Sequence, residues 1–390
     1  EQNAFLSAFA ISNYRISRPE DGIELYAPSR SNLETMADYA ANAKNFYETL
    51  LGPYPFSRLA VTAIDDEASA GIGPQANIFI PESLWRIPGQ HPMASLVPEV
   101  VSHEIGHQYF FNLIGVTDQP EAWMSEAFAE YVATRASEDR TGSSAHLRRN
   151  YWTYIYEVPG NDDVGLWGVA VRESRYYFPI VYQKGSAVLG VLRTRLGGEA
   201  FDTMLRDYVS AFAGATTTTA EFRDFVVENV DVDWASKFFD DWVYRPGYPD
   251  LTVTAKRGRN DDEPLVITIR QQPTKGAAFD GPLPIRLRGP APPVDQAIAL
   301  QNGDYEIELG DHQWLEIDPE LSLFRRIRPE PVGDVNFNGV VDGMDLLDAN
   351  AALRTDSEDE AWSDHLDTND DRRIDQQDLV KIIEQFGQGW

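Results

Sequence analysis

The chain has 390 residues, of which 43% are hydrophobic and 12% aromatic. It is therefore long enough for about two to four domains of roughly 100–200 residues and too apolar to be disordered. The formal net charge of −29 argues against nucleic acid or an anionic membrane as the main partner. The absence of cysteine excludes disulfides, thiolate catalysis and cysteine-ligated zinc.

The beginning of the chain predicts strands and one long helix. Residues 1–28 alternate like strands around Phe9, Ile11, Ile23 and Leu25. A capping box at 31–34 begins an amphipathic helix that runs to residue 51. Buried strands are predicted at 59–64 and 77–80, separated by a glycine-rich stretch at 70–74 where another backbone can approach closely.

The middle of the chain predicts helices, and the next part predicts strands. Helical spacing runs from about 98 to 244, with helices expected at 98–114, 121–140, 144–157, 179–197, 199–212, 219–229 and 234–243. Strands expected at 251–254, 265–269, 283–287 and 305–309, with turn residues between them, predict a small β-sandwich. Residues 328–331, with two prolines, predict a linker.

Targeting and membrane segments are not visible in the sequence. No apolar run approaches the roughly 18 residues of a transmembrane helix. The first residues have neither a basic nor an apolar region, so we expect that an export signal either lies upstream of Glu1 or never existed. After the linker the charge changes sharply, because residues 332–390 hold 15 acidic and 4 basic side chains. This imbalance calls for a counter-ion or full solvation.

The segment 103–107 carries the strongest chemical signal, a His-Glu-x-x-His motif. His103 and His107 are about one helical turn apart, so both imidazoles face the same way and can bind one ion. Glu104 lies at the edge of that face, where it can contact a metal-bound water rather than the metal. The alternative is an ordinary helix with two surface histidines.

A catalytic zinc needs a third protein ligand and one open coordination position. Glu126 and Glu130 on the next predicted helix are four residues apart and share a face. One can ligate the ion while the other hydrogen-bonds a ligand histidine, and the spacing does not say which does which. Two exposed acids on an amphipathic helix are the simpler interpretation of this pair taken alone. Two neutral nitrogens and one carboxylate favour zinc over calcium or magnesium.

This pattern, with Glu126 nineteen residues after His107, resembles the gluzincin metallopeptidases of the aminopeptidase N family. The resemblance covers roughly residues 5–325. It extends to further matching positions: Asn112, Trp123, the run 125–131, the Tyr-x-Lys-Gly motif at 182–185, and the segments 22–28 and 242–249.

The resemblance implies the roles of the site residues. Glu126 would be the third ligand of a single zinc ion, and Glu130 would lie in the shell behind the ligands. Glu104 would act as general base toward the activated water. Tyr182 would hydrogen-bond the tetrahedral intermediate and so stabilise the oxyanion.

The resemblance also implies a multidomain α+β chain. Residues 29–249 would form a mostly helical, thermolysin-like catalytic domain, followed by the β-sandwich at 250–328. We expect residues 1–28 to be the remnant of an upstream β domain. Residues 332–390 lie beyond this resemblance, and the repeat described below predicts a further domain there with paired EF-hand-like calcium loops.

One departure from the family concerns substrate binding. Aminopeptidases of this family carry a Gly-x-Met-Glu-Asn segment whose glutamate binds the free amino group of the substrate. The matching residues are Gly71, Ile72 and Gly73, and glycine occupies the glutamate position. A buried ammonium needs a carboxylate partner, so we expect weak dependence on a free N-terminus. The acidic cluster at 65–67 either substitutes for that glutamate or is a solvated loop.

The acidic segment contains a repeat of twelve-residue loops with the oxygen spacing of calcium sites. The predicted ligands of the two Ca²⁺ ions are Asp334, Asn336, Asn338, Val340, Asp342 and Asp345 in the first loop, and Asp367, Asn369, Asp371, Arg373, Asp375 and Asp378 in the second. Val340 and Arg373 would ligate through their carbonyl oxygens. The alternative is an acidic disordered tail.

The two units lie 33 residues apart and resemble a type I dockerin, which implies a cohesin domain of a scaffold protein as partner. Arg372 replaces the usual glycine at loop position 6, so the second site is expected to be weaker or strained. We expect the tail to fold only with calcium. The combined prediction is a secreted or surface-associated zinc metallopeptidase. A non-catalytic binding protein on a peptidase scaffold, and a hydrolase of non-peptide amides or epoxides, remain as alternatives.

Overall fold

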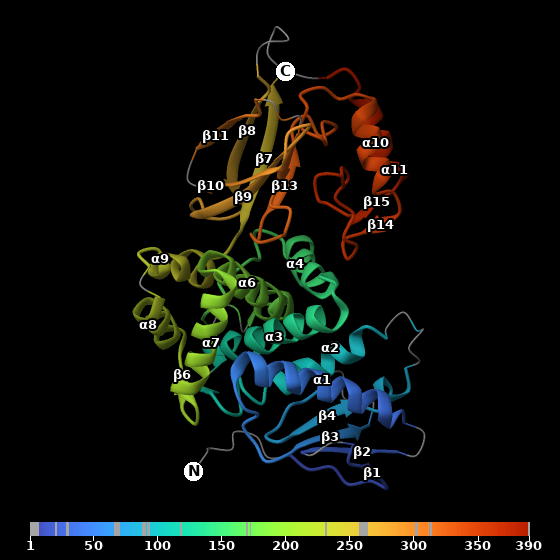
Figure 1. Cartoon of the computed structure of the whole chain (residues 1–390), viewed down its shortest axis with the longest axis vertical. Helices are drawn as coiled ribbons and strands as arrows, with labels where there is room; N and C mark the ends of the chain where they lie inside the picture. The colour runs from blue at the N-terminus through green and yellow to red at the C-terminus, as the bar shows by residue number, and fades with distance from the viewer. Residues whose placement is uncertain are drawn as a thin grey trace. The chain divides into compact units, whose positions relative to one another are not determined.

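The computed structural model describes residues 8–388 apart from 20–21, 29–30, 66–70, 88–90, 92–93, 118, 169–170, 172, 231, 257–263, 301–302, 311 and 313. The chain forms two compact units (Figure 1). The first comprises Glu1–His146, Leu166–Leu189 and Leu196–Lys237, and the second comprises Leu147–Gly165, Gly190–Arg195 and Phe238–Trp390. The sheets after residue 249 and the acidic tail therefore share one unit, in contrast to the predicted division into separate domains.

A four-stranded sheet forms one side of the first unit. Its order is β1 (Arg15–Ser17), β2 (Ile23–Ala27), β3 (Leu59–Ile64) and β4 (Asn77–Pro81). β1 pairs antiparallel with β2, and the remaining pairs are parallel. The first five residues of the central strand β3 are buried, as expected for a strand covered on both faces. The two strands expected to belong to an upstream domain are thus part of this sheet, and no boundary between compact units falls at residue 28.

Helices pack against this sheet and against one another. Helix α1 (Leu33–Leu51) contacts β2, and α2 (Leu96–Gly106) contacts both β4 and α3 (Trp123–Thr141) (Figure 1). The other elements of this part are the 3-10 turns η1 (Leu84–Arg86) and η2 (Gln119–Glu121), the π-helical turn η3 (Pro179–Lys184), α6 (Gly185–Leu196), α7 (Gly198–Phe212), α8 (Thr219–Val230), and the short strands β5 (Gly115–Val116) and β6 (Thr216–Thr217). Residues Gly190–Arg195 of α6 belong to the second unit. The helices predicted before residue 230 are confirmed, with two exceptions, and the helix predicted at 234–243 is divided into α9 (Ala235–Phe239) and the π-helical turn η4 (Asp240–Tyr244).

The exceptions are the end of α2 and the start of the helix predicted at 179–197. Helix α2 ends at Gly106 rather than at 114, and the side-chain amide of Asn112 donates a hydrogen bond of 2.8 Å to the carbonyl of His107 at that end. The segment 179–184 is a π-helix before α6 continues it. Both departures lie beside the residues of the His-Glu-x-x-His and Tyr-x-Lys-Gly motifs, where local hydrogen bonding overrides regular α-helix geometry.

The second unit contains most of α4 (Ala145–Glu157) and two sheets that follow α9 (Ala235–Phe239) and the π-helical turn η4 (Asp240–Tyr244). One sheet has the order β11 (Asp304–Glu308), β8 (Val266–Pro273), β7 (Pro249–Lys256) and β13 (Arg326–Pro329). The other has the order β10 (Val294–Leu300), β9 (Gly281–Arg288) and β12 (Trp314–Ile317). Alternate residues of β7 and β9 are buried, so one face of each sheet is covered. The four strands expected from the sequence are confirmed, whereas their stacking as a sandwich stays a prediction.

The linker predicted at 328–331 is wrong at its first two residues. Arg328 and Pro329 end strand β13, which pairs in parallel with β7. The neighbouring Ile327 is 2% exposed, so the strand is anchored in the core. A proline is tolerated in β13 because this strand lies at the edge of its sheet, where one side makes no ladder hydrogen bonds.

The tail has the same local structure twice. Helices α10 (Gly343–Ala351) and α11 (Gln376–Glu384) each begin with a capping box, and the short strands β14 (Thr355–Asp356) and β15 (Arg373–Ile374) pair antiparallel. In each loop the backbone N–H groups of positions 5 and 6 donate to the carboxylate of position 1. Position 6 is left-handed in both loops, with φ of 84° at Gly339 and 68° at Arg372. Every helix in the described residues is too short or too polar to cross a membrane.

Candidate metal centre

Three side chains of ligand type converge where α2 packs on α3. Oε2 of Glu126 lies 3.4 Å from Nε2 of His103 and 3.1 Å from Nε2 of His107. Two ligand atoms about 2.0–2.1 Å from a tetrahedral zinc lie roughly 3.3 Å apart, so this spacing fits one zinc ion. Within the described part of the chain, these residues are the one group of three such side chains whose ligand atoms all lie within 4.8 Å.

The close approach of the two helices depends on a glycine in the motif itself. A Cβ at Gly106 would lie 3.0 Å from the Cα of Ala129 and 3.1 Å from a methyl group of Val132. The absence of a side chain at this position lets the backbone of α3 come near enough for Glu126 to reach both imidazoles. The helix–helix packing is therefore part of the metal site.

The other ring nitrogen of each histidine is held by the protein. Nδ1 of His103 lies 2.9 Å from Oε2 of Glu130. Nδ1 of His107 lies 3.1 Å from the carbonyl oxygen of Phe110 and 3.2 Å from Oγ of Ser125. Such contacts fix the ring orientation and leave Nε2 available for a metal. The sequence spacing did not decide which of Glu126 and Glu130 would face the metal. In the structure Glu126 faces the Nε2 atoms of both histidines, whereas Glu130 faces Nδ1 of His103.

The charges of this cluster are strongly coupled. Burial raises the pKa of the Glu126 carboxyl, but the neighbouring His107 and His103 outweigh burial and hold the pKa below its usual value. Burial also raises the pKa of the Glu130 carboxyl, but His146 and then His103 outweigh burial and hold the pKa well below its usual value. Both carboxylates are therefore ionised at neutral pH, as a cation site requires.

Sequence reasoning missed His146, near the start of α4. Its Nε2 lies 2.7 Å from Oε1 of Glu130, and the residue is 4% exposed. No motif spacing marks this histidine, which is sixteen residues beyond Glu130 on a different helix. The only signal was that the chain has six histidines, and a histidine on a helix is more often a packed or surface residue.

Glu104 lies against a glycine-bearing backbone segment. The residue is 6% exposed, and burial raises the pKa of its carboxyl. A Cβ at Gly71 would lie 2.6 Å from Oε1 of Glu104, and one at Gly73 would lie 3.0 Å from its Oε2. The two glycines therefore leave the space that the Glu104 carboxylate occupies.

The segment 71–74 is held in place by hydrogen bonds. Ile72 exchanges two backbone hydrogen bonds with Phe79 of β4, of 3.0 and 2.7 Å. The carbonyl of Gly73 accepts a hydrogen bond of 2.7 Å from the side chain of Asn112. Ile72 is 43% exposed. Residues 66–70, with most of the acidic cluster at 65–67, lie outside the described residues.

Tyr182 lies beside the metal cluster on η3. Its ring stacks on that of His103 at 5.5 Å and on that of Phe178 at 4.4 Å. Burial, followed by the charge of Glu126, raises the pKa of the Tyr182 hydroxyl, which therefore stays protonated and can donate a hydrogen bond. The glycine of the Tyr-x-Lys-Gly motif has a packing role, because a Cβ at Gly185 would lie 2.4 Å from the Cβ of Ala127.

The arrangement combines the parts that metal-assisted hydrolysis needs. It has two imidazoles and one carboxylate whose ligand atoms lie within 4.8 Å of one another, a buried carboxyl group at Glu104, and a protonated phenol whose ring stacks on that of His103. All of these side chains come from the first unit.

Comparison with known proteins gives similar sequences among the aminopeptidases. The chain is 26% identical over 232 residues to "Aminopeptidase M1-A" of Oryza sativa subsp. japonica, covering 56% of this chain and 26% of the relative. It is 26% identical over 299 residues to "Aminopeptidase N" of Lactococcus lactis subsp. cremoris, covering 70% and 34%. For "Aminopeptidase N" of Lactobacillus helveticus the values are 24% over 378 residues, covering 88% and 44%. The chain spans less than half the length of these relatives.

A family profile also matches the region that contains the candidate metal ligands. The profile described as "Peptidase family M1 domain" matches residues 35–242, which is more than half of the chain and includes His103, His107, Glu126 and Tyr182. The chain belongs to peptidase family M1.

Proposed function

We propose that this chain is a zinc-dependent metallopeptidase that hydrolyses peptide bonds. The observation that carries the proposal is the spacing of 3.1 and 3.4 Å between Oε2 of Glu126 and the Nε2 atoms of His107 and His103. The donor set of two imidazoles and one carboxylate suits zinc, and both Nδ1 atoms have protein partners. The similarity to proteins named aminopeptidases supports the same activity.

The residues around the metal then have distinct roles. A zinc ion bound there supplies Lewis-acid polarisation of the peptide carbonyl and lowers the pKa of a water molecule. Glu104 accepts the proton of that water and passes it to the leaving amine, a task suited to a carboxyl whose pKa burial raises. The hydroxyl of Tyr182 donates to the oxygen on which negative charge develops. Glu130 keeps the ring of His103 in its ligating orientation.

The substrate preference follows from Gly73. Residue 73 carries no carboxylate, and a side chain at this position would lie within 3.0 Å of the Glu104 carboxylate. A free α-amino group therefore finds no carboxylate at residue 73, the position that supplies one in an aminopeptidase. We propose that peptides with a blocked N-terminus, or bonds within a peptide, are accepted. Cleavage rates of one peptide with a free and with an acetylated N-terminus test this, and loss of turnover on acetylation would contradict it.

A substitution of Glu104 separates an active enzyme from a binding protein built on the same fold. The Glu104→Gln variant should keep its zinc and lose hydrolysis, because glutamine cannot accept the proton. If the wild-type chain loaded with zinc cleaves no peptide, the result would favour a binding protein over an enzyme. Mass-spectrometric mapping of cleavage positions in a peptide library, beside a panel of amides and epoxides, separates a peptidase from a hydrolase of other substrates.

We further propose that the tail binds two calcium ions as a dockerin does. The support is the duplicated loop geometry and the burial of the carboxylates at positions 1 and 12, which are Asp334, Asp345, Asp367 and Asp378. Burial raises the pKa of Asp345 and Asp378, which are ringed by backbone N–H donors. Oxygen-rich loops with buried carboxylates fit a hard cation such as calcium. Calorimetric titration of the full chain should give two calcium sites.

A cohesin domain of an extracellular scaffold is the proposed partner of the tail. Helices α10 and α11 expose apolar side chains that a partner would cover, namely Met344, Leu347, Val380 and Ile383. The calcium sites and the scaffold both suit a secreted or surface-associated protein, which is the proposed location. Binding of purified cohesin domains with and without calcium tests the partner, and calcium-independent binding would argue against a dockerin.

A further inference from the structure

The tail is joined to the rest of the second unit by a buried segment between its two loops. Trp362 is 2% exposed, and its ring lies 4.7 Å from that of Trp152 on α4. Arg148, on the same helix, donates a hydrogen bond of 2.6 Å to the carbonyl of Trp362. Burial of a tryptophan and of an arginine against a carbonyl is typical of a fixed domain core rather than of a flexible tether.

A buried ion pair lies next to this contact. Nη1 of Arg325 is 3.2 Å from the carboxylate of Asp364, and both side chains are almost fully buried. The same carboxylate accepts a hydrogen bond of 2.5 Å from the backbone N–H of Ile327 in β13. The tail residue Asp364 is therefore one of two buried carboxylates, with Asp318, that pair with the arginine preceding strand β13.

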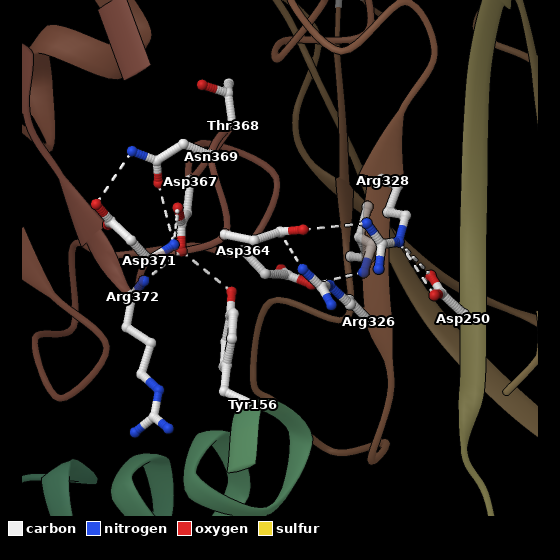
Figure 2. Close-up of polar contacts among 12 residues, drawn as sticks. Tyr156, Asp250, Arg326, Arg328, Asp364, Asp367, Thr368, Asn369, Asp371 and Arg372 are labelled. Atoms are coloured by element: carbon white, nitrogen blue, oxygen red, sulfur yellow. Dashed lines mark hydrogen bonds and ion pairs between the residues drawn. The ribbon is translucent and has the colours of Figure 1, made fainter. Parts of the chain in front are cut away.

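The second loop, residues 367–378, continues this contact (Figure 2). The hydroxyl of Tyr156 on α4 points toward Asp367 and donates a hydrogen bond of 3.1 Å to its Oδ2. Asp370, at position 4, pairs with Arg326, and with Arg328 at 3.2 Å. The guanidinium of Arg372, at position 6, lies 3.2 Å from Glu157.

The two loops differ in this respect. Residues of the first loop, Asn336 and Asn338 among them, line an open groove together with Trp314 of β12. Backbone hydrogen bonds of 2.9 Å join Val341 of the first loop to the end of the tail at Gly387 and Gln388. The second loop instead contacts α4 and β13, so the duplicated halves of the tail have different surroundings.

The contact with α4 involves a predicted calcium ligand. Oδ2 of Asp367 accepts from Tyr156 and from the backbone N–H of Arg372, while Oδ1 accepts from the N–H of Asp371 inside the loop. A hydrogen bond to the outer oxygen orients the carboxylate and leaves the inner oxygen for the ion. Groups behind a metal ligand commonly change metal affinity by about 10- to 100-fold.

Arg372 gives a second link between loop and helix. Its backbone has φ of 68°, a conformation that favours glycine, and the first loop has glycine there. The arginine side chain reaches Glu157 and lies 5.3 Å from the ring centre of Tyr156. Arginine in place of the usual glycine at position 6 thus brings a guanidinium group to Glu157 and Tyr156 of α4, which glycine could not do.

We infer that the second loop is an attachment site within the chain, and that calcium binding in this loop and its attachment to α4 through Tyr156 stabilise each other. The inference rests on the proposed calcium loops. The second loop then fixes its half of the tail to the second unit.

The test uses the full chain and reads each loop separately. In an Asp345→Asn background, calorimetry reports the second loop, and Tyr156→Phe should weaken its calcium affinity about tenfold. In an Asp378→Asn background, the same change should leave the first-loop affinity within about twofold. Tyr14→Phe removes a hydroxyl that binds the carbonyl of Ala63 in the first unit, and it should change neither loop.

The other outcomes are distinguishable. An unchanged second-loop affinity in Tyr156→Phe would overturn the inference and leave the proposed calcium sites intact. Absence of calcium binding in both backgrounds would overturn the calcium proposal and the inference together. Hydrogen exchange provides a second measurement, in which Arg328→Gln should speed exchange at 367–378 and Arg270→Gln, which removes an exposed pair with Asp304, should not.

Discussion

Nε2 of His146 lies 2.7 Å from Oε1 of Glu130. The other oxygen of this carboxylate lies 2.9 Å from Nδ1 of His103, so a line of three buried groups leads from α4 to the metal cluster. His146 does not face the cluster itself and acts through Glu130. The charge of His146 is the first of the causes that lower the pKa of Glu130 against burial, so this carboxylate stays ionised beside His103.

The first prediction concerns this histidine. His146→Gln should weaken zinc binding roughly tenfold, because Glu130 loses its second partner and holds His103 less firmly. Competition with a chelator measures the zinc affinity, and the kcat of the fully loaded variant should fall less than its affinity. The exposed His91→Gln is the matched control. Unchanged zinc affinity in His146→Gln would refute the positioning role.

The second prediction concerns the glycine next to the general base. Gly73→Ala should lower peptide hydrolysis about 10- to 100-fold, because its Cβ would lie 2.9 Å from the Glu104 carbonyl and must displace that residue. Zinc content should fall less than activity, because the added Cβ is nearest to Glu104 and lies 3.1 Å from the Cβ of His107. Gly190→Ala, on α6 with open space around it, is the control. Full activity of Gly73→Ala would show that Glu104 tolerates displacement.

The third prediction concerns the buried ion pair of the second unit. Asp364→Ala should destabilise this unit by about 1–3 kcal/mol, because Arg325 loses one of its two buried carboxylate partners and the N–H of Ile327 loses its acceptor, while Asp318 still lies 3.3 Å from Nε of Arg325. Thermal unfolding followed by domain-resolved hydrogen exchange would locate the loss in strands β7 and β13 as well as in the tail. Asp295→Ala, which removes an exposed partner of Arg286, should have little effect. A loss confined to the tail would mean that the tail folds independently.

The fourth prediction is a pH dependence at Glu24 on β2. Hydrogen bonds from Tyr26 and Arg18, with Arg58 nearby, lower the pKa of Glu24 to about 2. A carboxyl whose folded pKa is below its unfolded value stabilises the fold above the unfolded value of about 4.3, and this contribution is lost as pH falls toward 2. The melting difference between wild type and Glu24→Gln should therefore shrink from pH 6 to pH 3. A difference that stays constant would contradict this assignment.

The sequence predicted the metal cluster well because a helix fixes the direction of its side chains. His103 and His107 needed only the helical period, whereas the choice between Glu126 and Glu130 came from the family resemblance. Atomic positions were needed to separate the two acids, since both lie on one face of α3. His146 could not be found, because its contact with Glu130 depends on how α4 meets α3.

The departures in the fold have similar causes. Strand β10 was not predicted because most of its residues are exposed and it lacks apolar alternation. Strand β13 was read as a linker because two prolines dominate local preference, while pairing with β7 decides the structure. The repeat in the tail was visible from spacing, but its attachment to Tyr156 depends on a contact across 211 positions of sequence. Long-range packing of this kind leaves no local pattern.

The central claim is that His103, His107 and Glu126 bind one zinc ion. Anomalous diffraction at the zinc edge, from crystals of the zinc-loaded full chain, tests it most directly. We predict one peak about 2.0–2.2 Å from Nε2 of each histidine and from Oε2 of Glu126. A loaded crystal with its zinc peak elsewhere, or without a peak between α2 and α3, would contradict the claim.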